Sequence, residues 1–207
     1  MNSIVCNCCL SGYIYRKQGR QFDNPFFWNR ITCNDFIKLV RNYRNLDYTN
    51  LDLVKNDDLK DVSPLDIGPN QFSVILEDIG VRIQFNHVKF SPRDMSPRVE
   101  RINEYQGNTF YSKPYELVLE AFLRRSRRYT AERRNNTLFV FVDNASQYDS
   151  PQDIRDLLET ATKTKERLVL VTRSSGIEST EYARVVTIPP EDFIFERIAE
   201  NYIDLFM

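Results

Sequence analysis

Short apolar runs recur along this chain, and they limit the folds that it can adopt. The runs are Ile4–Cys9, Leu138–Val142 and Leu168–Val171. A strand with one wet face alternates apolar and polar residues, whereas a strand that is apolar along its length must be covered on both faces. Segments with helical spacing lie between the runs. We therefore predict an α/β fold with a mainly parallel central sheet flanked by helices in three layers, formed by residues 1–207 as a single domain.

Turn and cap signals place the other elements. A β-hairpin, or two adjoining strands, is expected around residues 72–86, because apolar residues alternate with polar ones there. Ser11 and Asn34 are expected to cap the helices that follow them, and Ser150 to begin another. A loop is predicted at 56–70 and a polar, mobile segment at 90–108. The remaining predictions are strands at Leu51–Val54 and Val185–Ile188, and helices at Gly12–Gln18, Asp35–Tyr43, Tyr115–Arg133 and Asp192–Leu205.

The composition is that of an ordinary globular protein. Hydrophobic residues make up 42% of the 207 residues, and 28 basic residues nearly balance 29 acidic ones. A net charge of −1 gives no general attraction to nucleic acid or to an anionic membrane, so neither is expected as a partner. No apolar run approaches the roughly 20 residues that span a bilayer, and no signal peptide is recognised. We therefore expect a cytoplasmic protein with reduced cysteines.

The point where the first strand turns into a helix is where we expect a ligand to bind. In parallel sheets, ligands lie beyond the carboxyl ends of the strands, and helix N-termini there attract anions. The polar and small residues at these ends are Asn7, Ser11, Gly12, Asp143, Asn144 and Arg173. Their amides, carboxylate, hydroxyl and guanidinium suit a sugar or a nucleotide-sugar-like small molecule. The alternative is that polar residues simply mark loops.

Cys9 and His87 are the residues that suggest covalent catalysis. Cys9 ends the first strand beside a predicted helix N-terminus, which favours a nucleophilic thiolate, and His87 is the only histidine. A Cys/His pair of this kind supports acyl or glycosyl transfer, with His87 as the base. The alternative is that the thiols are buried core residues and that His87 makes one structural hydrogen bond. A metal site is disfavoured, because adjacent Cys8 and Cys9 would point to opposite faces of a strand; no cofactor is expected.

An arginine-rich stretch follows in the second half of the chain. Arg125 and Arg128 lie three residues apart on a predicted helix, so they share a face and are candidates for binding a phosphate. A solvated helix face, or an internal ion pair, is the alternative. The sequence has neither a Gly-x-Gly-x-x-Gly pattern nor a Gly-Lys-Ser/Thr phosphate loop, so the corresponding nucleotide folds have no support.

Several short motifs resemble a bacterial family, the domain-of-unknown-function 1919 proteins. Asn7 to Tyr15 is similar to that family's opening strand, its Asn-Asn-Cys-Trp-Gly-Gly-like turn and its aromatic-Ile-Tyr. Cys8 stands here for asparagine, Leu10 for tryptophan and Ser11 for glycine. Other similar segments are Asn24-Pro25-Phe26, Asp35 to Leu39, Asp78-Ile79 with Phe85-Asn86-His87, Phe122 to Tyr129, and Asn136 to Val142.

The resemblance implies a role rather than a reaction. The family has no assigned activity, and its members often occur among capsular or exopolysaccharide biosynthesis proteins. The expected function is therefore a transferase-like enzyme acting on a sugar-containing substrate. Cys9 would be its nucleophile or oxyanion neighbour, and the match to the family's arginine segment supports Arg125 and Arg128 as anion-binding residues. The alternative is a non-catalytic sugar- or phosphate-binding or scaffold protein of the same pathway.

Overall fold

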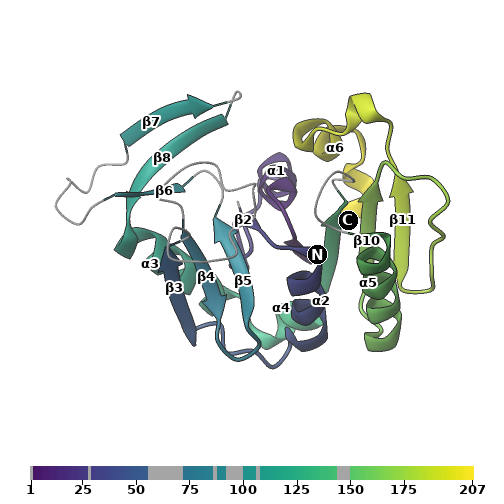
Figure 1. Ribbon diagram of the computed structural model, residues 1–207, viewed down its shortest axis with the longest axis horizontal. Helices are drawn as coiled ribbons and strands as arrows, with labels where there is room; N and C mark the ends of the chain where they lie inside the picture. The colour runs from purple at the N-terminus through teal and green to yellow at the C-terminus, as the bar shows by residue number, and fades with distance from the viewer. Residues whose placement is uncertain are drawn as a thin grey trace.

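The computed structural model describes residues 2–27, 29–55, 72–85, 88–91, 100–105, 108–143 and 150–207 (Figure 1). Within these ranges the chain combines a parallel sheet, an antiparallel sheet and helices, so the predicted α/β class is confirmed in its mixed form. The single domain stays a prediction. The predicted loop at 56–70 lies outside the described residues.

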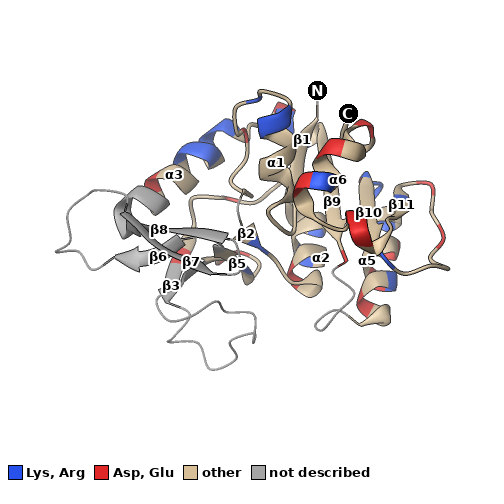
Figure 2. Ribbon diagram, turned by 90° about the horizontal axis from the view of Figure 1, so that it is seen from above, with Lys and Arg blue, Asp and Glu red and all other residues tan. Residues whose placement is uncertain are grey.

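The apolar runs form the predicted parallel sheet. Its strands are β1 (Ser3–Cys6), β9 (Thr137–Val142), β10 (Leu168–Thr172) and β11 (Ala183–Thr187). They lie side by side in the order β1-β9-β10-β11, which Figure 2 shows, and every neighbouring pair is parallel. β1 therefore pairs with a strand that begins more than half the chain away.

Each face of the parallel sheet packs against its own pair of helices. The helices are α1 (Leu10–Lys17), α2 (Cys33–Asn42), α5 (Pro151–Thr164) and α6 (Phe195–Asn201). Successive strand residues point to opposite faces. Ile4 and Cys6 therefore share a buried cluster with α1 and α6, whereas Val5 shares another with α2 and α5. The three-layer arrangement of the whole chain stays a prediction.

Two further sheets complete the described strands. An antiparallel sheet has the order β2-β5-β4-β3, and a mixed sheet has the order β6-β8-β7. The predicted hairpin is confirmed, because β4 and β5 pair antiparallel around Gly80, whose φ of +58° suits glycine. The bounds are β2 (Asn29–Arg30), β3 (Leu51–Lys55), β4 (Phe72–Leu76), β5 (Val81–Phe85), β6 (Val88–Ser91), β7 (Glu100–Tyr105) and β8 (Asn108–Pro114).

The segment at 90–108, predicted to be polar and mobile, contains a strand that was not expected, β7. Charged and amide residues interrupt the apolar pattern of that strand, and pairing with β8 supplies the order that local sequence does not indicate. β3 and β11 lie close to their predicted positions.

Two of the predicted helix caps are wrong. α1 begins at Leu10 with Cys9 as its N-cap, and the Ser11 hydroxyl instead donates to the carbonyl of Phe26 at 3.2 Å. α2 is capped by Thr32, whose Oγ1 accepts from the amide of Asp35, rather than by Asn34. In α2 the hydroxyl of Thr32, two residues before Asn34, accepts from a first-turn N–H group in its place.

The helix expected after Ser150 is confirmed. Ser150 and Asp153 form a reciprocal capping box around Pro151, as helix N-termini favour. The two other long helices are shorter than predicted. The first divides at Thr130 into α3 (Tyr115–Arg128) and α4 (Ala131–Asn135), and the last is α6 between the 3-10 turns η2 (Pro190–Asp192) and η3 (Ile203–Phe206).

A buried carboxylate joins the amino end of the parallel sheet to the helices around it. Asp23 Oδ1 accepts from Ser3 Oγ at 2.9 Å and from the Tyr15 hydroxyl at 2.5 Å. Asp23 Oδ2 accepts from Arg20 at 3.4 Å and from Arg133 Nη1. Burial raises the pKa of the Tyr15 hydroxyl, and the neighbouring Asp23 carboxylate adds to that rise. β1, α1, the segment after it and α4 therefore meet at one side chain.

Asp23→Asn tests this junction. We expect the substitution to lower the free energy of unfolding by about 2 kcal/mol, because two guanidinium groups lose their counter-charge. Urea titration followed by circular dichroism measures the change. Glu159→Gln is the control, because it removes an exposed pair with Lys163 and should change stability by less than about 0.5 kcal/mol. Equal stability of the two variants would contradict the role of Asp23.

Candidate functional site

Asn7 follows β1 and continues its pairing with β9. The backbone amide of Val142 donates to Asn7 Oδ1 at 2.8 Å, and Asn7 Nδ2 donates to the Val142 carbonyl at 3.2 Å. The side chain is buried and both ends of its carboxamide bond to backbone. Asn7 thus fixes the carboxyl end of the first strand, and its predicted contact with a substrate stays a prediction.

Asp143 and Thr172 meet at the carboxyl ends of the next two strands. Thr172 Oγ1 donates to Asp143 Oδ2 at 2.7 Å and accepts from the amide of Ser174 at 3.0 Å. Both side chains are buried. The structure therefore brings Asn7, Asp143 and Thr172 to one edge of the sheet, as the strand-end argument predicts. The bond between Thr172 and Asp143 is an addition that sequence spacing does not reveal.

Arg173 extends from the same edge. Its guanidinium lies over the ring of Phe193, 4.3 Å from the ring centroid, while the residue itself is exposed. No ion pair of Arg173 occurs within the part of the chain that the structure describes. Phe193 was not predicted for this site; in the sequence it begins the apolar run Phe193-Ile194-Phe195, which does not indicate a contact with Arg173.

The start of α1 is closely packed. Cys9 is only 3% exposed, and Ser11 is fully buried. The Gly12 amide donates to the Cys9 carbonyl at 3.0 Å, and the N-cap side chain makes no capping bond. His87 and Asn144 lie outside the described residues, so the predicted Cys9–His87 pair stays a prediction.

The neighbouring thiols are buried and reduced. Cys6 Sγ and Cys8 Sγ lie 3.6 Å apart in a hydrogen bond, and burial, with Cys6 beside it, raises the pKa of the Cys8 thiol. Cys33 is also a buried free thiol. Among the described residues, no group of three or more His, Cys, Asp or Glu side chains could hold a metal ion.

Arg125 and Arg128 contact the segment that follows α1. The Arg125 guanidinium lies over Phe22, 5.1 Å from the ring centroid, and burial, followed by the charges of Arg124 and Arg128, lowers its pKa to about 10. Arg128 Nη1 donates to the Phe22 carbonyl at 3.3 Å. With its amide oxygen turned toward Arg128, Gln21 accepts from both Nη atoms at 3.1 and 3.2 Å. These contacts lie along the chain beside Asp23, not at the carboxyl edge of the sheet.

Basic residues are concentrated toward the C-terminal end of α3 (Figure 2). The last turn of α3 carries Arg125, Arg127 and Arg128, and in the described part of the chain neither Arg125 nor Arg128 pairs with a carboxylate. The internal ion pair that was the alternative for these two arginines is therefore not formed among the described residues. Neighbouring guanidinium groups without a counter-charge favour the binding of an anion.

A comparison with protein-family models matches residues 1–111 to DUF1919, a domain of unknown function. The matched stretch is more than half of the 207 residues. The chain belongs to the DUF1919 family. A search of curated proteins finds no match. The residues matched to DUF1919 include Asn7, Cys9 and His87, whereas Arg125, Asp143 and Arg173 lie beyond them.

The DUF1919 stretch depends on the rest of the chain for its first strand, because β1 pairs with β9. Within the described ranges, no helix has the length and apolar character that a membrane crossing requires.

Thiol reactivity tests whether Cys9 is accessible. Because all four cysteines are buried, we expect dithionitrobenzoate to react with the native chain at least roughly tenfold more slowly than with the unfolded chain. Absorbance of the released thiolate gives the rates. A single fast thiol that disappears in Cys9→Ala would contradict this expectation and identify Cys9 as an exposed nucleophile.

Arg125→Met tests whether the partly buried Arg125 charge, beside other arginines, lowers the free energy of unfolding. A guanidinium whose pKa falls to about 10 in the fold destabilises the folded state at pH 7, and this penalty disappears only as the pH rises from about 10 to 12.5. We therefore expect the variant to unfold at higher urea concentration, with a gain of about 1 kcal/mol at pH 7. The exposed Arg127→Met, in the same turn of α3, is the matched control, with a change below about 0.5 kcal/mol. A loss of stability in Arg125→Met would contradict the expectation that the Arg125 charge destabilises the folded state.

Proposed function

We propose that this DUF1919 chain is a transferase-like enzyme that acts on a sugar-containing substrate in exopolysaccharide or capsule biosynthesis. One observation supports it most: an exposed guanidinium, Arg173, is held over Phe193 beside the buried Asp143–Thr172 pair at the carboxyl edge of the parallel sheet. This edge is where parallel α/β sheets bind their ligands.

The residues at this edge suit a sugar that carries a phosphate. Stacking on Phe193 restricts the Arg173 guanidinium while leaving its N–H groups able to donate to a phosphate oxygen. The first turn of α1 has no acidic residue and no side-chain cap, which would favour a second anionic oxygen once the packed start of that helix opens. In this proposal Cys9 is the nucleophile or the oxyanion neighbour, His87 is the base, and the substrate is a sugar or a nucleotide-sugar-like molecule.

A non-catalytic sugar- or phosphate-binding protein of the same pathway is the second candidate. The packing around Cys9 favours it, because the thiol is 3% exposed and Ser11 is fully buried. A nucleophile must reach its substrate, so catalysis would require the start of α1 to open. Binding at Arg173 requires no such movement, because that side chain is already exposed.

Complementation of a deletion in the producing organism tests the proposal. Arg173→Gln should lower the amount of extracellular polysaccharide by about tenfold, because the substrate loses a charge-assisted contact. Cys9→Ser and His87→Ala should each lower it at least as much if the chain is an enzyme. Protein levels are measured by immunoblot in every strain, and Arg155→Gln, an exposed arginine on α5, is the control.

The three variants separate the two candidates. Normal polysaccharide in Cys9→Ser and His87→Ala, together with a loss in Arg173→Gln, would reject the enzyme and leave the binding protein. Normal polysaccharide at normal protein level in Arg173→Gln would reject a carboxyl-edge site altogether.

A further inference from the structure

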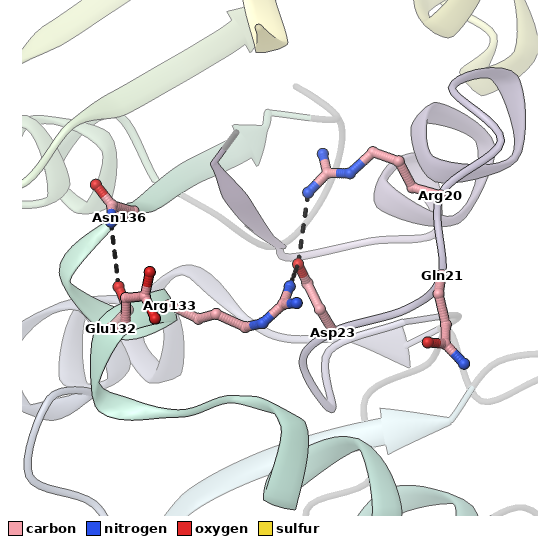
Figure 3. Close-up of a pocket in the computed structure, with 6 residues that line it drawn as sticks. All are labelled: Arg20, Gln21, Asp23, Glu132, Arg133 and Asn136. Carbon is pink, nitrogen blue, oxygen red and sulfur yellow. Dashed lines mark hydrogen bonds and ion pairs between the residues drawn. The ribbon is translucent and has the colours of Figure 1, made fainter.

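A polar cavity lies at the opposite end of the parallel sheet. It has a volume of about 410 Å³ and is lined by Arg20, Gln21, Asp23, Glu132, Arg133 and Asn136 (Figure 3). Asn136 directly precedes β9, whereas Asp143 directly follows it, so the cavity and the carboxyl-edge residues are at opposite ends of the same strand. A volume within roughly 300–1,000 Å³ is typical of small-molecule sites.

Asp23 organises the wall of this cavity rather than acting in it. Its carboxylate already accepts from Ser3, Tyr15 and Asn24 on one oxygen and from two arginines on the other. With both oxygens already accepting from protein donors, this carboxylate has little capacity left to contact a ligand directly. Its effect is to hold the two guanidinium groups, which reach it from opposite sides (Figure 3).

Arg133 has the capacity to bind a further anion. Within the described residues its side chain bonds only through Nη1, to Asp23, and the side chain is 49% exposed. Nη2 and Nε therefore keep N–H groups for a ligand. Arg20 is almost fully used by protein partners, but Arg128 adds a positive charge next to Gln21. Asp23 thus holds two guanidinium groups at the cavity, and the remaining N–H groups of Arg133 favour an oxyanion.

The part of the lining formed by α4 and its C-cap, beside Arg133, offers hydrogen-bond acceptors (Figure 3). Asn136 Nδ2 donates to the backbone carbonyl of Glu132 at 3.2 Å, which leaves Asn136 Oδ1 for a donor. The Glu132 carboxylate is exposed and makes no ion pair within the described part of the chain. Glu132 would repel a bare oxyanion, but it would accept hydrogen bonds from the hydroxyl groups of a larger ligand. A ligand with an anionic end and a hydroxylated end would match both the N–H donors of Arg133 and the acceptors of Glu132 and Asn136.

We propose that this cavity binds a sugar phosphate. Arg133 holds the phosphate group, and Glu132 and Asn136 accept from the sugar hydroxyls. The cavity is distinct from the carboxyl-edge site, and its ligand does not depend on the proposed transferase function.

Isothermal titration of the full chain with glucose 6-phosphate tests the proposal. Inorganic phosphate and glucose are titrated separately. Each should bind at least about tenfold more weakly, because phosphate contacts only the guanidinium donors and glucose only the acceptors. Arg133→Gln should weaken glucose 6-phosphate at least about tenfold by removing its charge-assisted contact. Glu132→Gln should weaken glucose 6-phosphate about threefold while strengthening inorganic phosphate, because repulsion is removed.

Arg197→Gln is the matched control, because this arginine is 53% exposed and also faces an aspartate, yet lies on α6; its affinity should equal that of the wild type. Equal binding of glucose 6-phosphate to Arg133→Gln and wild type would overturn the proposal, as would a wild type that binds only inorganic phosphate or nothing. If circular dichroism shows that Arg133→Gln is unfolded, Glu132→Gln decides: unchanged affinity for both ligands overturns the proposal. The polysaccharide assay on Arg173 is independent of this titration. The sugar-phosphate cavity and the transferase-like function can therefore each be rejected without affecting the other.

Discussion

The carboxylate of Asp23 is the interaction on which the amino end of this structure depends. Removing a carboxylate from water is costly, and the fold offsets that cost with hydroxyl, amide and guanidinium donors from segments up to 110 residues apart. The same bonds set the position of α4 and of the chain after α1. Arg20 and Arg133, which both bind this carboxylate, also line the cavity beside it.

The sequence predicts structure that depends on neighbouring residues better than structure that depends on contacts between distant segments. Apolar runs and the Ser150-Pro151 start are local signals, and they indicated the parallel strands and α5. The first run was predicted as a strand up to Cys9, but β1 ends at Cys6 and Cys9 is the N-cap of α1. Ser11 failed as a cap because its partner, the Phe26 carbonyl, is set by packing between segments. The predicted helix over Tyr115–Arg133 was too long because the Tyr129 hydroxyl bonds to Thr137 across the break, which no helical periodicity encodes.

The candidate site shows the same division. Strand ends could be read from the sequence, so Asn7, Asp143 and Arg173 were expected at one edge. The aromatic support under Arg173, and the contacts of Arg125 and Arg128 with the Gln21–Phe22 segment, required the folded chain. The arginine cluster stays in the fold with its positive charges largely uncompensated. Proteins commonly accept such a loss of stability where a ligand later supplies the missing charge.

The pairing of β1 with β9 also determines the order of events during synthesis. Ser3 aligns with Thr137, so the first strand leaves the ribosome long before its partner exists. Until then, the buried run Ile4-Val5-Cys6 has no strand beside it, and a nascent chain that has reached only the end of the DUF1919 match is incomplete in this respect. Closing so long a loop is entropically slow, which makes β1 a late strand and a candidate for chaperone contact during translation.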